Sequence, residues 1–170
     1  DRTFRDVHNY GVLTVAGVIG KSSNVGISKI ALTLNKKNMW DILHQAGFGQ
    51  PTGVQLPGEV SGLLNPYSKW VPVDQASISF GYGISVTQLQ LARAYLAIAN
   101  DGLALPVTLQ HTETVAPGER IMSAKTARRL RSMLELAVSD AGTGRAARVA
   151  DYRVAGKTGT VRKLTPDGYS

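Results

Sequence analysis

Hydrophobic residues recur at helical spacing in the first third of the chain. The segment 25–35 carries five apolar side chains at i, i+3, i+4 spacing, which predicts a helix: Val25, Ile27, Ile30, Ala31 and Leu34. A second helix is predicted over 38–47, with Asn38 as its N-cap and Gly47 ending it. Residues 48–75 are rich in glycine and proline and predict a long irregular connection.

Two further helices are predicted in the second half. Thr87 and Gln90 form a capping box, and one face of the helix after them is apolar: Leu89, Ala92, Leu96 and Ala99. Ser123 is expected to cap a helix over about 124–139.

Alternating β-branched residues predict extended chain over 106–115, and 151–163 is typical of a strand. Helices followed by one clear strand indicate a mixed α/β fold. A single strand is not stable alone, so its partners are expected outside residues 1–170.

Composition narrows the function classes. The chain is 43% hydrophobic and 18% charged, as in ordinary globular proteins, and it has no cysteine for disulfides or thiolate metal sites. It has no apolar run long enough to cross a membrane. The histidines are too scattered for a helical metal site, and no metal or cofactor is expected: His8, His44 and His111.

The net charge of +7 does not indicate nucleic-acid binding. The densest basic cluster lies in a predicted helix, where it is interpreted as a solvated face: Arg128, Arg129 and Arg131. No aromatic residues interleave with it, as binding to single strands would require.

The two Gly-Lys-[Ser/Thr] triplets are not phosphate-binding loops. Such a loop needs a glycine five residues before its second glycine, and these positions hold Val15 and Asp151.

The KTGT sequence at 157–160 suits the binding of an anionic ligand. On a strand, Lys157 and Gly159 would share one face, and Thr158 and Thr160 the other. Without a side chain at Gly159, a ligand could lie against the backbone beside the ammonium group. The alternative is an ordinary exposed strand end.

The KSSNVG sequence at 21–26 is a second polar motif. Ser22 and Asn24 place a hydroxyl and an amide side by side, able to relay a proton and to hold a carbonyl. The alternative, capping of the following helix, is compatible with this role.

An S-x-N turn and a K-T-G strand are two of the three motifs of penicillin-binding proteins and serine β-lactamases. The third, S-x-x-K, carries the nucleophilic serine, and no serine in the printed sequence has a lysine three residues later. The sequence nevertheless resembles the transpeptidase domain of class B penicillin-binding proteins, in particular the septal type, over essentially its whole length. The resemblance extends to SFGYGISVTQLQLARAY and to GTGRAARVADYRVAGKTGTVRK.

The resemblance implies the serine β-lactamase/D,D-peptidase fold, with 1–170 as a partial transpeptidase domain: a helical part and part of an antiparallel sheet, without the S-x-x-K segment and the last strands. It implies catalytic roles for Ser22, Asn24 and Lys157. Five residues would bind substrate: Tyr82, Thr158, Gly159, Thr160 and Arg162.

The implied reaction joins peptidoglycan stem peptides through a serine acyl-enzyme, with β-lactams as mimics of the D-Ala-D-Ala substrate. Division proteins would be partners of the enzyme. The site would face the periplasm at the septum, and a segment absent from this sequence would anchor the protein in the inner membrane. Without the nucleophile, this stretch is expected to be inactive alone. The alternatives are a D,D-carboxypeptidase or β-lactamase, and a non-catalytic interaction module. Glu59 is expected to have a structural role.

Overall fold

A computed structural model describes residues 3–54, 56–114, 116–160, 164–165 and 168–169. The described chain is mostly helical. Its helices are α1 (Val15–Lys21), α2 (Asn24–Thr33), α3 (Lys36–Gln45), α4 (Pro72–Ile78), α5 (Gln88–Ala99) and α6 (Ala124–Val138), with short 3-10 turns η1 (Tyr67–Lys69) and η2 (Arg145–Ala147).

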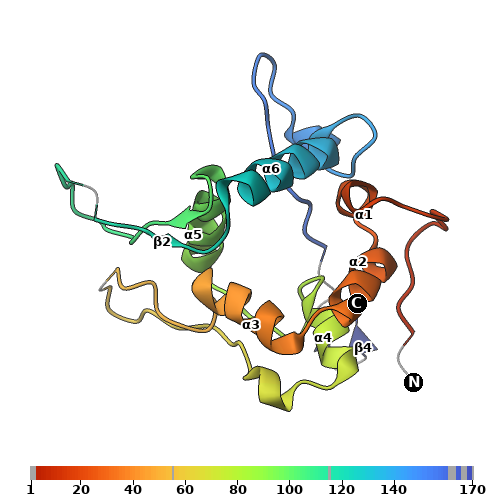
Figure 1. The fold of residues 1–170 in the computed structure, drawn as a ribbon, viewed down its shortest axis with the longest axis horizontal. Helices are drawn as coiled ribbons and strands as arrows, with labels where there is room; N and C mark the ends of the chain where they lie inside the picture. Colours follow the sequence, from red (N-terminus) through yellow and green to blue (C-terminus); the bar gives the residue numbers. More distant parts are fainter. Residues whose placement is uncertain (1–2, 55, 115, 161–163, 166–167, 170) are drawn as a thin grey trace.

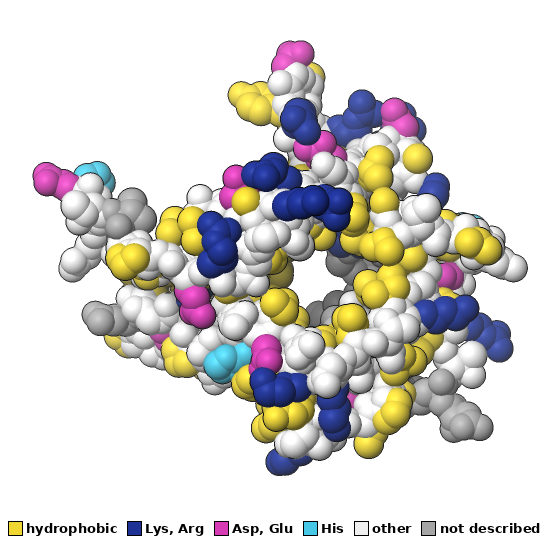
Figure 2. Space-filling view, viewed as in Figure 1, with side chains coloured by type: hydrophobic (Ala, Val, Ile, Leu, Met, Phe, Trp, Pro, Cys, Tyr) yellow, Lys and Arg dark blue, Asp and Glu magenta, His cyan; other side chains and the backbone are white. Residues whose placement is uncertain are grey.

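The strands are two residues long each and form two antiparallel pairs. β1 (Leu103–Ala104) pairs with β2 (Glu119–Arg120), and β3 (Leu164–Thr165) pairs with β4 (Gly168–Tyr169). In Figure 1 the helices surround an opening, with α6 and α1 on one side and α3 and α4 on the other. Figure 2 shows hydrophobic side chains along parts of the rim of this opening.

Side-chain caps begin several of the helices. Thr87 and Gln90 form the predicted capping box of α5, and Ser123 caps α6 through the N–H of Thr126, as predicted. The predicted cap of α3 is wrong: Asn35, not Asn38, accepts from the N–H of Lys37, so the cap lies three residues earlier than expected.

Two helices were not predicted. α1 has the sequence VAGVIGK, whose two glycines hide its helical character, and Thr14 caps it through the N–H of Gly17. α4 lies at the end of the stretch 48–75 that was predicted to be irregular. It begins at Pro72, a favourable first helical residue, and Asp74 accepts from the N–H of Val71.

The predicted extended segments are not strands in the described chain. Most of 106–115 belongs to the connection between β1 and β2, which projects from the body (Figure 1). Residues 151–160 are in no strand, because no strand of the described ranges pairs with them. The part of the prediction on 161–163 lies outside the described residues.

Small residues form most of the core. Ala97 and Ala104 pack with Ile121, beside Ala46 and Met122. The four residues of the apolar face predicted for α5 are all exposed in the described chain: Leu89, Ala92, Leu96 and Ala99. Periodicity identified an apolar face but not the side of the helix that has a neighbour in this chain.

Gln90 lies in the first turn of α5, on its buried side. Its side chain is fully buried, donating from Nε2 to the carbonyl oxygens of Gln50 (2.7 Å) and Ser61 (2.8 Å) and accepting from the N–H of Thr87. A single amide therefore holds the irregular segment 50–61 against α5.

Two other polar clusters fix connections. Arg131 on α6 donates to Asp101 (2.7 Å) and to the carbonyl of Ile98 (2.7 Å), which joins α6 to the end of α5. Part of the basic cluster thus has a structural role instead of forming only a solvated face. Glu59 accepts from the backbone N–H of Thr52 (2.6 Å) and from its hydroxyl, and so closes a loop.

We expect Gln90→Leu to destabilise the fold strongly. The substitution leaves two carbonyls and one N–H without their partner, and each unpaired buried group costs about 1–3 kcal/mol. The free energy of unfolding in urea should fall by about 3–5 kcal/mol. Gln88→Leu, at an exposed position on the same helix, is the matched control. An equal loss in both variants would contradict this role for Gln90.

Candidate active site at Ser22 and Lys157

Ser22 lies at the junction of α1 and α2. It is the C-cap of α1 and has left-handed backbone angles (φ 57°, ψ 43°), which are uncommon for a residue with a side chain. Its N–H donates to the carbonyl of Ile19 (3.2 Å), and that of Ser23 donates to Val18 (3.0 Å). These bonds end α1 and turn the chain at Ser22.

The residues after Ser22 begin α2. Ser23 is buried and caps the helix through the N–H of Gly26 (2.8 Å). Its hydroxyl donates to Asp6 Oδ2 (2.5 Å), and Asp6 Oδ1 accepts from the N–H of Val25 (3.0 Å). Asn24 is the first residue of α2 and is half-buried. The capping anticipated for this motif is thus performed by Ser23, which leaves the Ser22 side chain outside the cap.

Helix α6 brings the KTGT segment to this turn. The buried Gly20 of α1 lies on Leu136 of α6, and Lys21 Nζ donates to the carbonyl of Ala141 just beyond α6 (2.8 Å). On the returning chain, the N–H of Gly156 donates to the carbonyl of Leu134 (3.3 Å). Both segments therefore rest on the C-terminal half of α6.

The two motifs meet in one hydrogen bond. Lys157 Nζ donates to Ser22 Oγ at 2.6 Å, across 135 residues of sequence. The same ammonium group is 3.3 Å from Thr158 Oγ1 and 3.4 Å from the Thr158 carbonyl oxygen. Burial lowers the pKa of Lys157 below its usual 10.5, because the charged form loses solvation there. A serine hydroxyl thus contacts an amine whose proton is released more easily than usual.

The other residues of the KTGT motif are exposed. A side chain added at Gly159 would meet nothing within 4 Å, so the space beside it is open. Thr158 Oγ1 shares a hydrogen bond with Thr143 Oγ1 (2.8 Å) in the turn after α6. Thr160 is exposed. Arg162, named from the sequence, lies outside the described residues.

Tyr82 lies in the connection between α4 and α5 and is half-buried. Its ring packs edge to face on Phe80 (centroids 5.6 Å apart), and Phe80 packs in the same way on Phe4 (5.1 Å). Phe4 is two residues before Asp6. Tyr82 is therefore connected through two aromatic rings to the segment that carries Asp6.

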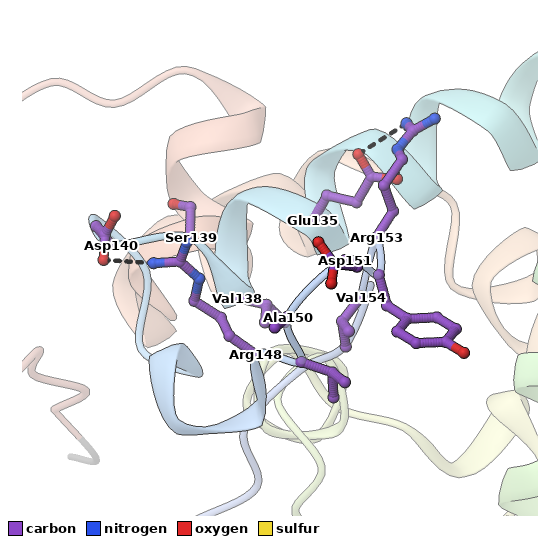
Figure 3. A pocket seen from close by; sticks show the side chains of 11 residues that line it. Glu135, Val138, Ser139, Asp140, Arg148, Ala150, Asp151, Arg153 and Val154 are labelled. Atoms are coloured by element: carbon purple, nitrogen blue, oxygen red, sulfur yellow. Dashed lines mark hydrogen bonds and ion pairs between the residues drawn. The ribbon is translucent and has the colours of Figure 1, made fainter.

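A separate hollow of about 570 Å³ lies between the end of α6 and residues 148–154 (Figure 3). Charged side chains at its rim pair with each other: Arg153 with Glu135 (2.9 Å) and Arg148 with Asp140 (2.7 Å). Neither Ser22 nor Lys157 lines it. The two arginines at its rim are thus neutralised by acidic neighbours.

Within the described ranges, no three metal-ligating side chains of His, Cys, Asp or Glu gather in one place. No helix in that part of the chain is long and apolar enough to cross a bilayer.

Asp6 and Thr143 are neighbours of the site that were not predicted from the sequence. Each forms a hydrogen bond across 15 or more residues, between segments without a shared periodic pattern. The sequence did indicate a capping serine before α2, but not which of the two serines caps it.

The family model described as the penicillin binding protein transpeptidase domain matches residues 2–170. The chain therefore belongs to the penicillin-binding protein transpeptidase family. It is 40% identical over 164 residues to the peptidoglycan D,D-transpeptidase FtsI of Escherichia coli K12, a match that covers 96% of this chain and 28% of FtsI. The expected family and fold are confirmed.

Solved structures support the same relationship. The transpeptidase domain of penicillin-binding protein 3 from Burkholderia pseudomallei superposes with a TM-score of 0.92 at 46% identity, covering 97% of this chain and 50% of that one. Penicillin-binding protein 3 from Mycobacterium tuberculosis, complexed with aztreonam, gives 0.87 at 36% identity, with coverages of 98% and 42%. The chain thus spans half or less of these solved chains.

We expect the side-chain amine of Lys157 to titrate below pH 10.5. Its ε-carbon signal, followed by NMR and assigned by its loss in Lys157→Arg, should show this directly. Between the folded-state pKa and 10.5, the unfolded chain holds this proton more tightly, so the contribution of Lys157 to stability rises with pH in that window. Ser22→Ala removes an acceptor of the ammonium group and should lower the pKa further. A midpoint at or above 10.5 would contradict the desolvation of this amine.

Proposed function

We propose that residues 1–170 are part of a peptidoglycan D,D-transpeptidase domain that cross-links stem peptides at the division septum. The contact of 2.6 Å between Lys157 Nζ and Ser22 Oγ carries the proposal, because it joins two catalytic motifs that are far apart in the sequence. Homology to FtsI supports the reaction class. The reaction forms an ester between a serine and the penultimate D-alanine, releases the terminal D-alanine, and then transfers the peptide to an amine.

Ser22 and Lys157 would move the proton that the leaving amine requires. The short hydrogen bond aligns the hydroxyl with the amine, and partial burial keeps competing water away from the amine. A lowered Lys157 pKa also eases release of the proton from nitrogen. The positive charge of Lys157, when protonated, would favour binding of the substrate carboxylate.

Asn24 and Gly159 would bind the substrate backbone. Asn24 lies two residues after Ser22, where its amide can hold a substrate amide group. The open space beside Gly159 lets an extended peptide approach the protein backbone closely. The N–H of Thr160 would then donate to the oxyanion of the tetrahedral intermediate.

Thr158 and Thr160 would hold the substrate carboxylate through their hydroxyls. A hydroxyl has one proton and two lone pairs. When Thr143 donates to Thr158 and Lys157 occupies the other lone pair, the Thr158 proton stays available for the carboxylate. Tyr82 would line the cleft, and Arg162 would supply a further contact.

The nucleophilic serine would come from an S-x-x-K segment elsewhere in the complete domain, since the printed sequence has none. The exposed leucines of α5 support a larger domain, because the described neighbours leave them uncovered. The complex of a relative with aztreonam supports β-lactam binding by the complete domain. The homology to FtsI supports a periplasmic location at the septum. We propose with it a membrane anchor elsewhere in the protein and division proteins as partners. The alternatives, a hydrolase and a non-catalytic module, predict different results in the experiments that follow.

We expect the complete protein that contains residues 1–170 to bind one molecule of a fluorescent penicillin covalently, as read by intact mass. The 170-residue chain alone should remain unlabelled, because it lacks the nucleophile. Lys157→Ala and Ser22→Ala should each slow labelling by about 100-fold or more, because general acid–base groups contribute about 10²–10⁴-fold.

The acceptor distinguishes the alternatives. With a D-Ala-D-Ala thioester and a D-amino acid, a transpeptidase gives the amide product, whereas a carboxypeptidase or β-lactamase gives mainly hydrolysis. Lys69→Ala, at an exposed lysine on η1, is the control for loss of charge. Labelling of the 170-residue chain, or a complete protein that takes no label, would overturn the proposal.

A further inference from the structure

We infer that Asp6 is a positioning residue that holds the Ser22 hydroxyl against Lys157. This inference rests on the proposed function of that pair. Asp6 touches neither Ser22 nor Lys157 within the described contacts. It would act through Ser23, the residue that follows Ser22 in the turn. It lies in the segment before α1, 17 residues from Ser23 in sequence.

The Asp6 carboxylate accepts two hydrogen bonds at the start of α2. One comes from the Ser23 hydroxyl (2.5 Å) and the other from the N–H of Val25 (3.0 Å). The Ser23 oxygen in turn accepts from the N–H of Gly26 (2.8 Å). The direction of the Ser23 hydroxyl is thus fixed, with its proton toward Asp6 and a lone pair toward the helix. A negative charge at a helix N-terminus is also electrostatically favourable.

These hydrogen bonds restrict Ser22 because they hold the next residue, Ser23, in place. The end of α1 binds the N–H groups of Ser22 and Ser23, and Asp6 fixes the side chain of Ser23. Left-handed backbone angles are unfavourable for serine and persist where the surroundings impose them. The hydrogen bonds that Asp6 and the end of α1 make with Ser23 act as a clamp on this residue. If the clamp loosens, Ser22 can relax toward ordinary backbone angles, and its Oγ would leave the 2.6 Å contact with Lys157.

The close packing of α1 on α2 makes the clamp rigid. A side chain at Gly26 would lie 2.6 Å from Val18 Cγ2, so the two helices touch where the cap forms. Phe4 anchors the segment that carries Asp6, through its ring contact with Phe80 (5.1 Å). Asp6 therefore lies on a segment that is anchored next to the turn. The residue that it binds, Ser23, is only 4% exposed.

The test uses the complete protein and separates binding of a fluorescent penicillin from the acylation step. Asp6→Asn retains the size of the side chain but replaces one acceptor oxygen with a donor. Its acylation rate constant should fall by about 10- to 100-fold, since small misplacements of catalytic groups have effects of this size. The dissociation constant of the initial complex should stay near that of the wild type. Ser23→Ala, which removes the bridging hydroxyl, should show the same split.

Asp41→Asn is the matched control, because Asp41 pairs with Lys37 on the surface of α3. A spectroscopic readout accompanies the kinetics: Asp6→Asn should move the Lys157 ε-carbon titration in the same direction as Ser22→Ala. An unchanged rate constant or an unchanged titration overturns the inference. So does a smaller labelled fraction with an unchanged rate, which is the signature of a purely structural role. A wild-type protein that takes no penicillin overturns the proposed function instead, and the titration then still decides whether Asp6 positions Ser22.

Discussion

The packing of α1 between α2 and α6 is the constraint on which the candidate site depends. Gly26 of α2 lies directly on Val18, and Gly20 lies on Leu136 of α6. Because both neighbours approach α1 closely, its last residue has little freedom, and the chain leaves it through a left-handed serine. The same helix α6 supports the returning segment at Gly156. Because α6 contacts both α1 and the segment that carries Lys157, it sets the distance between the serine and the lysine.

The turn after α6 contributes a second part of this constraint. A side chain at Gly142 would lie 2.2 Å from the Ala137 carbonyl oxygen, so the chain folds back tightly there. This lets the N–H of Gly144 reach that same oxygen (2.7 Å) and places Thr143 beside Thr158. The lysine segment is therefore located by hydrogen bonds to one helix end and the turn after it, and not by strand pairing within the described residues.

Local signals predicted what depends on local chemistry. The capping residues Thr87 and Ser123 and the helix at 25–35 could be read directly, because their hydrogen bonds span three or four residues. The pair of motifs could be recognised, but their contact could not, since nothing in the sequence shows which way α1 and α6 pack. The exposure of the apolar face of α5 could not be predicted for a related reason: periodicity shows that leucines share a side, and only tertiary structure shows what covers it. The carboxylate of Asp6 had no sequence signal at all.

The 135 residues between Ser22 and Lys157 have a consequence for the order in which the molecule is made. Asp6 and Ser23 are only 17 residues apart, so their hydrogen bond closes a short loop. Lys157 leaves the ribosome much later, and its approach to the serine requires α6 to be in place. Until then, the Ser22 hydroxyl has no Lys157 amine beside it. The proposed serine–lysine pair is completed only when the segment at Gly156 has joined α6 at Leu134.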